Sequence, residues 1–177
     1  MRFHDIPQFT KSASYAADIS WLYLEKWYGD QVEETNFDVN PDFQRGYVWV
    51  PLQKTRYVEF ILRGGTTGRD IFTNCPCWGR RLPKNNEYVL VDGKQRLEAV
   101  LGFLRNEVPI FGGHFRKDFT DEPNILTASF RWHVNDLKTR SEVLQWYLDL
   151  NSGGTVHSEE EFARVRKLLE RALENEA

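Results

Sequence analysis

The chain has 177 residues and a net charge of −3, and hydrophobic residues make up 41% of it, with 14% aromatic residues. This composition excludes a disordered chain and favours one domain with a sizeable core, spanning residues 1–177, over two cramped domains. The acidic balance argues against a surface that coats nucleic acid throughout, although it permits a local basic patch. No apolar run approaches the length of a membrane span and no signal-peptide core is present, so we expect a cytoplasmic protein without a membrane partner.

The first third of the chain predicts two helices separated by an irregular segment. Residues 14–30 have helical periodicity, with Asp18 as the expected N-cap. Residues 37–49 should be extended and irregular, because a proline and a glycine interrupt them. A second helix should begin at Pro51, a favourable first-turn residue, and end at the glycine pair 64–65. The apolar face of this second helix consists of Leu52, Val58, Ile61 and Leu62.

The middle of the chain predicts a strand, a turn, a second strand and a helix. Residues 70–78 read as a strand, and residues 80–87 as a polar turn. The apolar run 88–91 is typical of a short buried strand, and a helix should cover residues 94–105.

The last third predicts a turn with a short strand at 106–115, a strand at 128–136, and helices at 139–151 and 158–176. Ser158 and a glutamate three residues later form a capping box for the last, charged helix. Because strands and helices are interleaved, the sequence predicts an α+β domain with one modest sheet.

The two cysteines, Cys75 and Cys77, flank a proline inside the strand predicted at 70–78. A disulfide between residues two apart would be strained, and a metal would need further ligands at suitable spacing. We therefore expect ordinary reduced thiols, with a redox or metal role as the alternative.

The first candidate site lies between the strand predicted at 88–91 and the following helix. Two cations in the first turn of that helix oppose its dipole, and a bound phosphate would remove the conflict. A carboxylate beside them could hold a divalent cation or orient the arginine. An exposed lysine and an arginine paired with a nearby carboxylate explain the pattern equally well. The residues of this break are Asp92, Gly93, Lys94, Gln95 and Arg96.

Two further segments could contribute to a site. Arg45, next to Gln44 in the irregular segment, could bind a phosphate through two hydrogen bonds, but the segment alone favours a solvated arginine beside aromatic core anchors. Later, adjacent glycines could surround an anion with backbone N–H groups, although a plain turn between helices fits as well. The residues of this later segment are Asn151, Gly153, Gly154 and Thr155.

In this order, the segments NPDFQRGYVW, VDGKQRLEAVLGFL and LNSGGTVHSEEE resemble the DGQQR-motif family of the ParB/sulfiredoxin-like superfamily. This family forms the N-terminal domain of GmrSD-type modification-dependent restriction enzymes, and the likeness covers about residues 15–170. The resemblance implies a compact ParB/sulfiredoxin-like α+β domain with a small mixed sheet flanked by helices. It also implies binding and hydrolysis of a nucleoside triphosphate, coupled to DNA cleavage by a second, HNH-type nuclease domain.

Carried over by position, the resemblance gives catalytic roles to three residues. Arg45 and Arg96 would stabilise phosphate charge, and Asp92 would bind Mg²⁺ or position water. Lys94 replaces the first glutamine of the motif, which suits phosphate but leaves base preference and turnover open. The expected nucleotide-binding residues are Gln44, Gly93, Lys94, Gln95, Asn151, Gly153, Gly154 and Thr155.

Three functions follow as hypotheses. The first is a nucleotide-binding NTPase acting in or against a phage-defence system. Because the chain has no room for a nuclease domain, we expect no nuclease activity from it alone, and a separate effector or nuclease as partner. The second is a DNA-binding module using the helix at 163–171, although glutamates interrupt its basic stripe and favour a solvated face. The third is a regulator that senses nucleotide without turnover.

Overall fold

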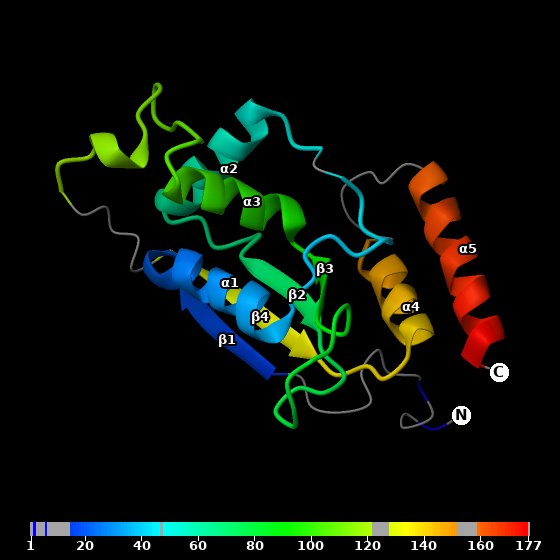
Figure 1. Cartoon of the computed structure of the whole chain (residues 1–177). Helices are drawn as coiled ribbons and strands as arrows, with labels where there is room; N and C mark the ends of the chain where they lie inside the picture. The colour runs from blue at the N-terminus through cyan, green and yellow to red at the C-terminus, as the bar shows by residue number, and fades with distance from the viewer. Residues whose placement is uncertain are drawn as a thin grey trace.

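The fold is a four-stranded mixed sheet with helices packed against it (Figure 1). The computed structural model describes residues 2, 6, 15–46, 48–121, 128–151 and 159–176. Within these ranges it contains five α-helices, one short 3₁₀ helix and one sheet. The predicted α+β class with a small mixed sheet is therefore confirmed.

The strands run in the order β1-β4-β2-β3 across the sheet. β1 (Tyr15–Ser20) pairs antiparallel with β4 (Ser129–Asn135), and β4 pairs parallel with β2 (Asp70–Asn74). β2 pairs antiparallel with β3 (Val89–Asp92). The central strands β4 and β2 thus come from distant parts of the sequence, and the sheet joins both halves of the chain.

The helix predicted at 14–30 is wrong in its first part, because residues 15–20 form β1. These residues pair one by one with β4, with Asp18 opposite Arg131, and this cross-strand pairing outweighs their local helical pattern. The helix α1 (Trp21–Thr35) begins six residues later than β1, and the Ser20 side chain, rather than Asp18, accepts a hydrogen bond from the Leu22 N–H at its start.

The remaining helices lie close to their predicted positions. α2 (Pro51–Leu62) buries Val58 and Ile61, but Leu52 in its first turn is exposed, so the predicted apolar face is wrong at that end. α3, α4 and α5 follow in the second half of the chain, and a 3₁₀ helix, η2, follows α3. Their bounds are α3 Lys94–Leu104, η2 Arg116–Asp118, α4 Arg140–Asn151 and α5 Glu159–Glu176. The predicted N-cap of the last helix lies outside the described residues.

One predicted strand is shorter than expected, and another is absent from the described structure. β2 ends at Asn74, two residues before Pro76, which has no N–H to donate to the sheet, and residues 75–78 form a turn instead. At 106–115 the described chain makes turns and one isolated bridge between Ile110 and His114, without a regular strand. The polar turn predicted at 80–87 is present.

The core consists of two clusters, one on each side of the sheet. Leu90 of β3 belongs to the cluster with α1, α2 and α3, whereas its neighbours Val89 and Val91 belong to the cluster with α4 and α5. Alternate strand residues point to opposite faces, so β3 is buried on both sides, as its continuous apolar sequence predicts. Figure 1 shows α3 leaving the end of β3, with α4 beside the same strand.

Candidate functional site

The candidate site is built on the turn from β3 to α3. Gly93 has a φ of 104°, and a Cβ at this position would lie 2.5 Å from Cδ1 of Ile71. The turn therefore requires glycine, both for its left-handed backbone and for its close approach to β2. The β2–β3 register also shifts between Phe72 and Thr73, at the same end of the ladder. No side chain caps the N-terminus of α3, which leaves that end of the helix suited to an anion.

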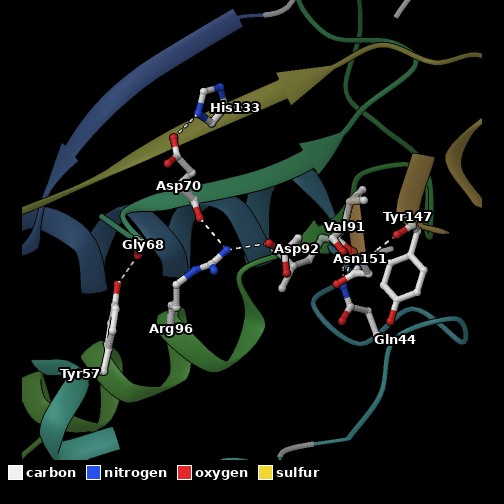
Figure 2. A network of polar contacts seen from close by, with 11 residues as sticks. Gln44, Tyr57, Gly68, Asp70, Val91, Asp92, Arg96, His133, Tyr147 and Asn151 are labelled. Atoms are coloured by element: carbon white, nitrogen blue, oxygen red, sulfur yellow. Dashed lines mark hydrogen bonds and ion pairs between the residues drawn. The ribbon is translucent and has the colours of Figure 1, made fainter. Parts of the chain in front are cut away.

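Arg96 links this turn to the neighbouring strand. Its Nη2 donates to Oδ2 of Asp92 at 2.7 Å and to the backbone oxygen of Asp70 at 3.0 Å (Figure 2). The carboxylate of Asp92 offsets the cation that stands at the unfavourable end of the α3 dipole. The Nε of Arg96 is buried and has no hydrogen-bond partner in the described structure. One donor of this guanidinium is therefore unused.

The polar network continues from Arg96 to β4, as Figure 2 shows. The side chain of Asp70 contacts Nε2 of His133 at 2.7 Å, and this imidazole stacks on Phe72 with ring centroids 4.7 Å apart. On the other side, the hydroxyl of Tyr57 donates to the backbone oxygen of Gly68 at 2.7 Å, and burial raises the pKa of this tyrosine. The network holds β2 and the residues just before it in place beside Arg96.

Lys94 is nearly buried, and its Nζ donates to the backbone oxygen of Arg45 at 2.9 Å. Burial lowers the pKa of Lys94, because an ammonium loses hydration there. This lysine therefore fastens the irregular segment to α3 while adding positive charge beside the turn.

Gln95 also fastens the irregular segment. Its Oε1 accepts hydrogen bonds from the backbone N–H groups of Val48 and Trp49, both at 3.1 Å. Its Nε2 donates to the backbone oxygen of Gly46 at 3.0 Å. These three contacts give Gln95 a positioning role, and direct contact with a nucleotide stays a prediction.

Gln44 attaches the other end of the same segment to the sheet. Its Nε2 donates to the backbone oxygens of Leu90 at 3.1 Å and Val91 at 2.7 Å (Figure 2). From α5, Arg164 donates to three successive carbonyls of the segment, those of Asp42, Phe43 and Gln44. The wall formed by residues 42–46 and 48–49 is thus held from both sides.

Arg45 lies in this wall, and its guanidinium is largely shielded from water but has no close anionic partner among the described residues. Its side chain is 18% exposed, and its closest acidic atom is Oε2 of Glu161, 3.8 Å from Nη1. That distance is too long for a hydrogen bond. Within the described part of the chain, the guanidinium makes no hydrogen bond. The sequence alone favoured a solvated Arg45, which is wrong because the side chain is mostly buried.

These groups surround one pocket of about 280 Å³. It gathers all the sequence-predicted site residues that lie in the described ranges, and Asn151 among them donates to the backbone oxygen of Tyr147 at 2.8 Å. The predicted residues in the pocket are Gln44, Arg45, Asp92, Gly93, Lys94, Gln95, Arg96 and Asn151. The other three, Gly153, Gly154 and Thr155, lie outside the described residues.

Sequence reasoning missed three residues that line the pocket, Trp49, Tyr147 and Leu150. Trp49 is one of the aromatic residues that the sequence predicts as core anchors beside Arg45, and the two α4 residues resemble ordinary core positions at helical spacing. Burial raises the pKa of Tyr147, and the nearby guanidinium of Arg45 partly opposes this rise. No local signal in the sequence distinguishes these residues from the rest of the core.

The described residues contain neither a metal-binding cluster nor a membrane-spanning helix. No group of three or more His, Cys, Asp or Glu side chains is placed to hold a metal ion. None of the described helices combines the length and apolar character needed to cross a membrane. Asp92 is the one carboxylate among the described residues that line the pocket.

Comparison with known proteins was informative for one family. Residues 24–145, more than half of the chain, match the family described as the GmrSD restriction endonuclease, N-terminal domain. The chain belongs to this family. The matched range includes the pocket residues before α2 and at the β3–α3 turn, whereas the pocket residues of α4, Tyr147, Leu150 and Asn151, lie beyond it. This GmrSD N-terminal domain matches no curated protein and no solved structure. Its membership connects it with restriction systems, while the DGQQR motif assignment stays a prediction.

Proposed function

We propose that this GmrSD-type N-terminal domain binds a nucleoside triphosphate in the pocket at the β3–α3 turn and hydrolyses it, in or against a phage-defence system. The observation that carries the proposal is the guanidinium of Arg45, which lines the pocket, is mostly buried, and makes no hydrogen bond within the described structure. A guanidinium offers five donors that match a phosphate, and one that is largely shielded from water but still reaches a pocket is suited to bind an anion there.

The charge of the pocket supports a phosphate ligand. Arg45, Lys94 and Arg96 supply three cations, and Asp92 is the one carboxylate among the described lining residues. The uncapped N-terminus of α3 adds further donors at the same place. A triphosphate would satisfy these donors and complement the positive charge.

The rest of the pocket suits a nucleoside. Trp49 and Tyr147 provide aromatic surface for stacking, and Gln44 and Asn151 provide amides for hydrogen bonds. The volume lies near the lower end of the range for small-molecule sites, about 300 Å³. A nucleotide would therefore fill the pocket with its phosphates toward α3.

The donor set fits Mg²⁺ only together with the nucleotide. Asp92 offers one carboxylate, already bound to Arg96, and Mg²⁺ is commonly held by one or two carboxylates, phosphate oxygens and water. When bound, the ion would neutralise phosphate charge. Arg45 and Arg96 would hold the phosphates, and Asp92 would keep Arg96 oriented or position the attacking water.

Sensing without turnover is the second candidate function. The ion pair of Asp92 with Arg96, at 2.7 Å, favours it, because this carboxylate is engaged and no other described side chain of the pocket is an obvious base. A DNA-binding role through α5 has less support, since Arg164 of its basic stripe is bound to backbone carbonyls of the 42–44 segment.

The experiment is to measure ATP, GTP, CTP and UTP binding by calorimetry, and phosphate release with Mg²⁺, for the wild type and for Arg45→Ala, Arg96→Ala and Asp92→Asn. We expect binding to weaken about tenfold or more in both arginine variants, because each removes charge-assisted hydrogen bonds. Loss of phosphate release with retained binding is expected for Asp92→Asn. Arg80→Ala, an exposed position outside the pocket, is the matched control.

The outcomes separate the functions. Binding with no phosphate release by the wild type would favour sensing. The absence of any nucleotide binding, together with salt-sensitive retention of DNA, would refute the nucleotide proposal and favour a DNA-binding module.

A further inference from the structure

An acidic side chain of α5 faces the cation on which the proposed function depends. Glu161 lies in the first turn of α5, and its Oε2 is 3.8 Å from Nη1 of Arg45. Both side chains are largely shielded from water, with 18% exposure for Arg45 and 26% for Glu161. Partial burial weakens solvent screening, so the two charges interact more strongly than an exposed pair would.

The position of Glu161 is set by the docking of α5. Arg164, three residues further along the same helix, is bound to the carbonyls of Phe43 and Gln44, which directly precede Arg45. Val165 of α5 is buried in the second core cluster. The carboxylate is thus presented to Arg45 by an anchored helix and not by a free loop.

The contact nevertheless leaves the donors of Arg45 unsatisfied. A guanidinium–oxyanion hydrogen bond is about 2.7–2.9 Å long, well inside the 3.8 Å separation found here. A phosphate could therefore make closer contacts with Arg45 than Glu161 does. Its negative charge would at the same time stand next to the carboxylate, and two like charges at such distances disfavour each other.

We propose that Glu161 competes with phosphate for Arg45 and thereby sets the affinity of the pocket for phosphate. The proposal rests on the proposed function of the site and names its regulation. Phosphate binding must displace or outweigh this carboxylate. Because the carboxylate belongs to α5, occupancy of the pocket is coupled to the first turn of that helix, and any contact that moves this turn changes the affinity of the pocket.

The test uses inorganic tripolyphosphate as the probe and isothermal calorimetry as the readout. Glu161→Gln removes the charge and keeps the size of the side chain. Its matched control is Glu160→Gln, the exposed neighbour in the same turn, which changes the net charge of the protein equally. We expect Glu161→Gln to bind tripolyphosphate about fivefold more tightly than the wild type, the size expected for loss of one partly screened charge, and Glu160→Gln to change affinity much less.

A double variant locates the effect at Arg45. In an Arg45→Ala background, Glu161→Gln should give a clearly smaller gain, because only the direct repulsion between the carboxylate and the phosphate is then relieved. Thermal unfolding of each variant checks that the fold is intact.

The outcomes distinguish the two proposals. Tripolyphosphate binding that is equal in the wild type, Glu161→Gln and Glu160→Gln would overturn the role of Glu161 while leaving the phosphate site in place. An equal gain in both glutamine variants would also overturn it, as a general charge effect. No binding by the wild type or by any variant would sink the proposed function and this inference together.

Discussion

Two turns lie at opposite ends of the β2–β3 ladder, and both carry residues capable of chemistry. The turn after β3 contains Gly93 and leads to Arg96, whereas the turn after β2 contains Cys75 and Cys77. A cavity adjoins each of them. The one beside the cysteines is larger, about 400 Å³ against about 280 Å³, so volume does not identify the site.

In the cysteine turn, the groups that could react are paired with each other. The two thiols are free and buried with their sulfur atoms 3.4 Å apart, and the backbone N–H of Cys75 donates to Asn135. The cation that lines this cavity, Arg81, makes two hydrogen bonds to the carboxylate of Glu87. The thiols and the guanidinium of this turn therefore already have partners within the protein.

In the β3–α3 turn, by contrast, donors remain unused. The guanidinium of Arg45 makes no hydrogen bond within the described structure, and the Nε of Arg96 is buried without a partner. The comparison teaches that the two turns differ in their cations: Arg81 already has an anionic partner, whereas Arg45 lines its pocket without a hydrogen bond in the described structure.

The largest effect is expected from Gly93→Ala. The substitution combines a positive φ of 104° with a Cβ only 2.5 Å from Ile71, so we expect a loss of about 3 kcal/mol of stability in urea unfolding. Gly79 is the matched control in the cysteine turn, with a φ of 72° but open space around its Cβ. Gly79→Ala should cost only the backbone strain, about 1 kcal/mol. Equal losses in both variants would show that the close approach of the β3–α3 turn to β2 is unimportant.

A smaller loss is expected from Gln95→Ala. Its three hydrogen bonds to the backbone of Gly46, Val48 and Trp49 would be lost, which should cost about 2 kcal/mol. Tripolyphosphate affinity should fall as well, because the wall that carries Arg45 loosens. Gln145→Ala, on the exposed face of α4, should change neither quantity appreciably. Unchanged stability of Gln95→Ala would refute its positioning role.

Most of the fold could be predicted from local pattern. The continuous apolar sequence of β3 and the periodicity of α3 gave both elements to within one residue of their observed ends. β1 could not be predicted, because residues 15–20 adopt a strand only through pairing with β4, more than a hundred positions later in the chain. Local propensity is a weak guide where a distant strand decides the outcome.

The site could be predicted in its residues but not in their roles. The order of the three segments predicted which side chains gather, and the pocket gathers those that are described. That Gln95 fastens Trp49, or that Arg45 lies near Glu161, depends on contacts between segments far apart in sequence. Which donors remain unused follows only from the completed network.

The buried thiol of Cys75 in the cysteine turn should make the stability of the protein fall at alkaline pH. Burial raises the pKa of Cys75 to about 12, so its folded pKa lies above its unfolded value near 9. The unfolded chain loses this proton first as pH rises, and stability present below pH 9 should decline by up to about 1 kcal/mol between pH 9 and pH 10. The decline should largely disappear in Cys75→Ala when urea unfolding is followed across this range. A decline of the same size in Cys75→Ala would assign it to other groups. Tyr88, whose burial raises its pKa to about 12, adds a decline of its own only above pH 10.

The smallest effect on stability is expected from Arg81, the cation that lines the cavity beside the cysteine turn. Hydrogen bonds from Arg81, followed by one from the Lys84 backbone, lower the pKa of Glu87 to about 2. A lowered folded pKa means that the ion pair stabilises the protein above about pH 4.5 and loses this contribution as pH falls toward 2. In Arg81→Gln, an NMR titration should place the pKa of Glu87 nearer its ordinary value. Because the pair is exposed, the unfolding temperature at pH 7 should hardly change. Tripolyphosphate affinity should also stay as in the wild type, since the guanidinium of Arg81 is already paired with the carboxylate of Glu87. A loss of affinity comparable to that of Arg45→Ala would mean that a paired arginine can serve as the phosphate site. The distinction between the two turns would then fail.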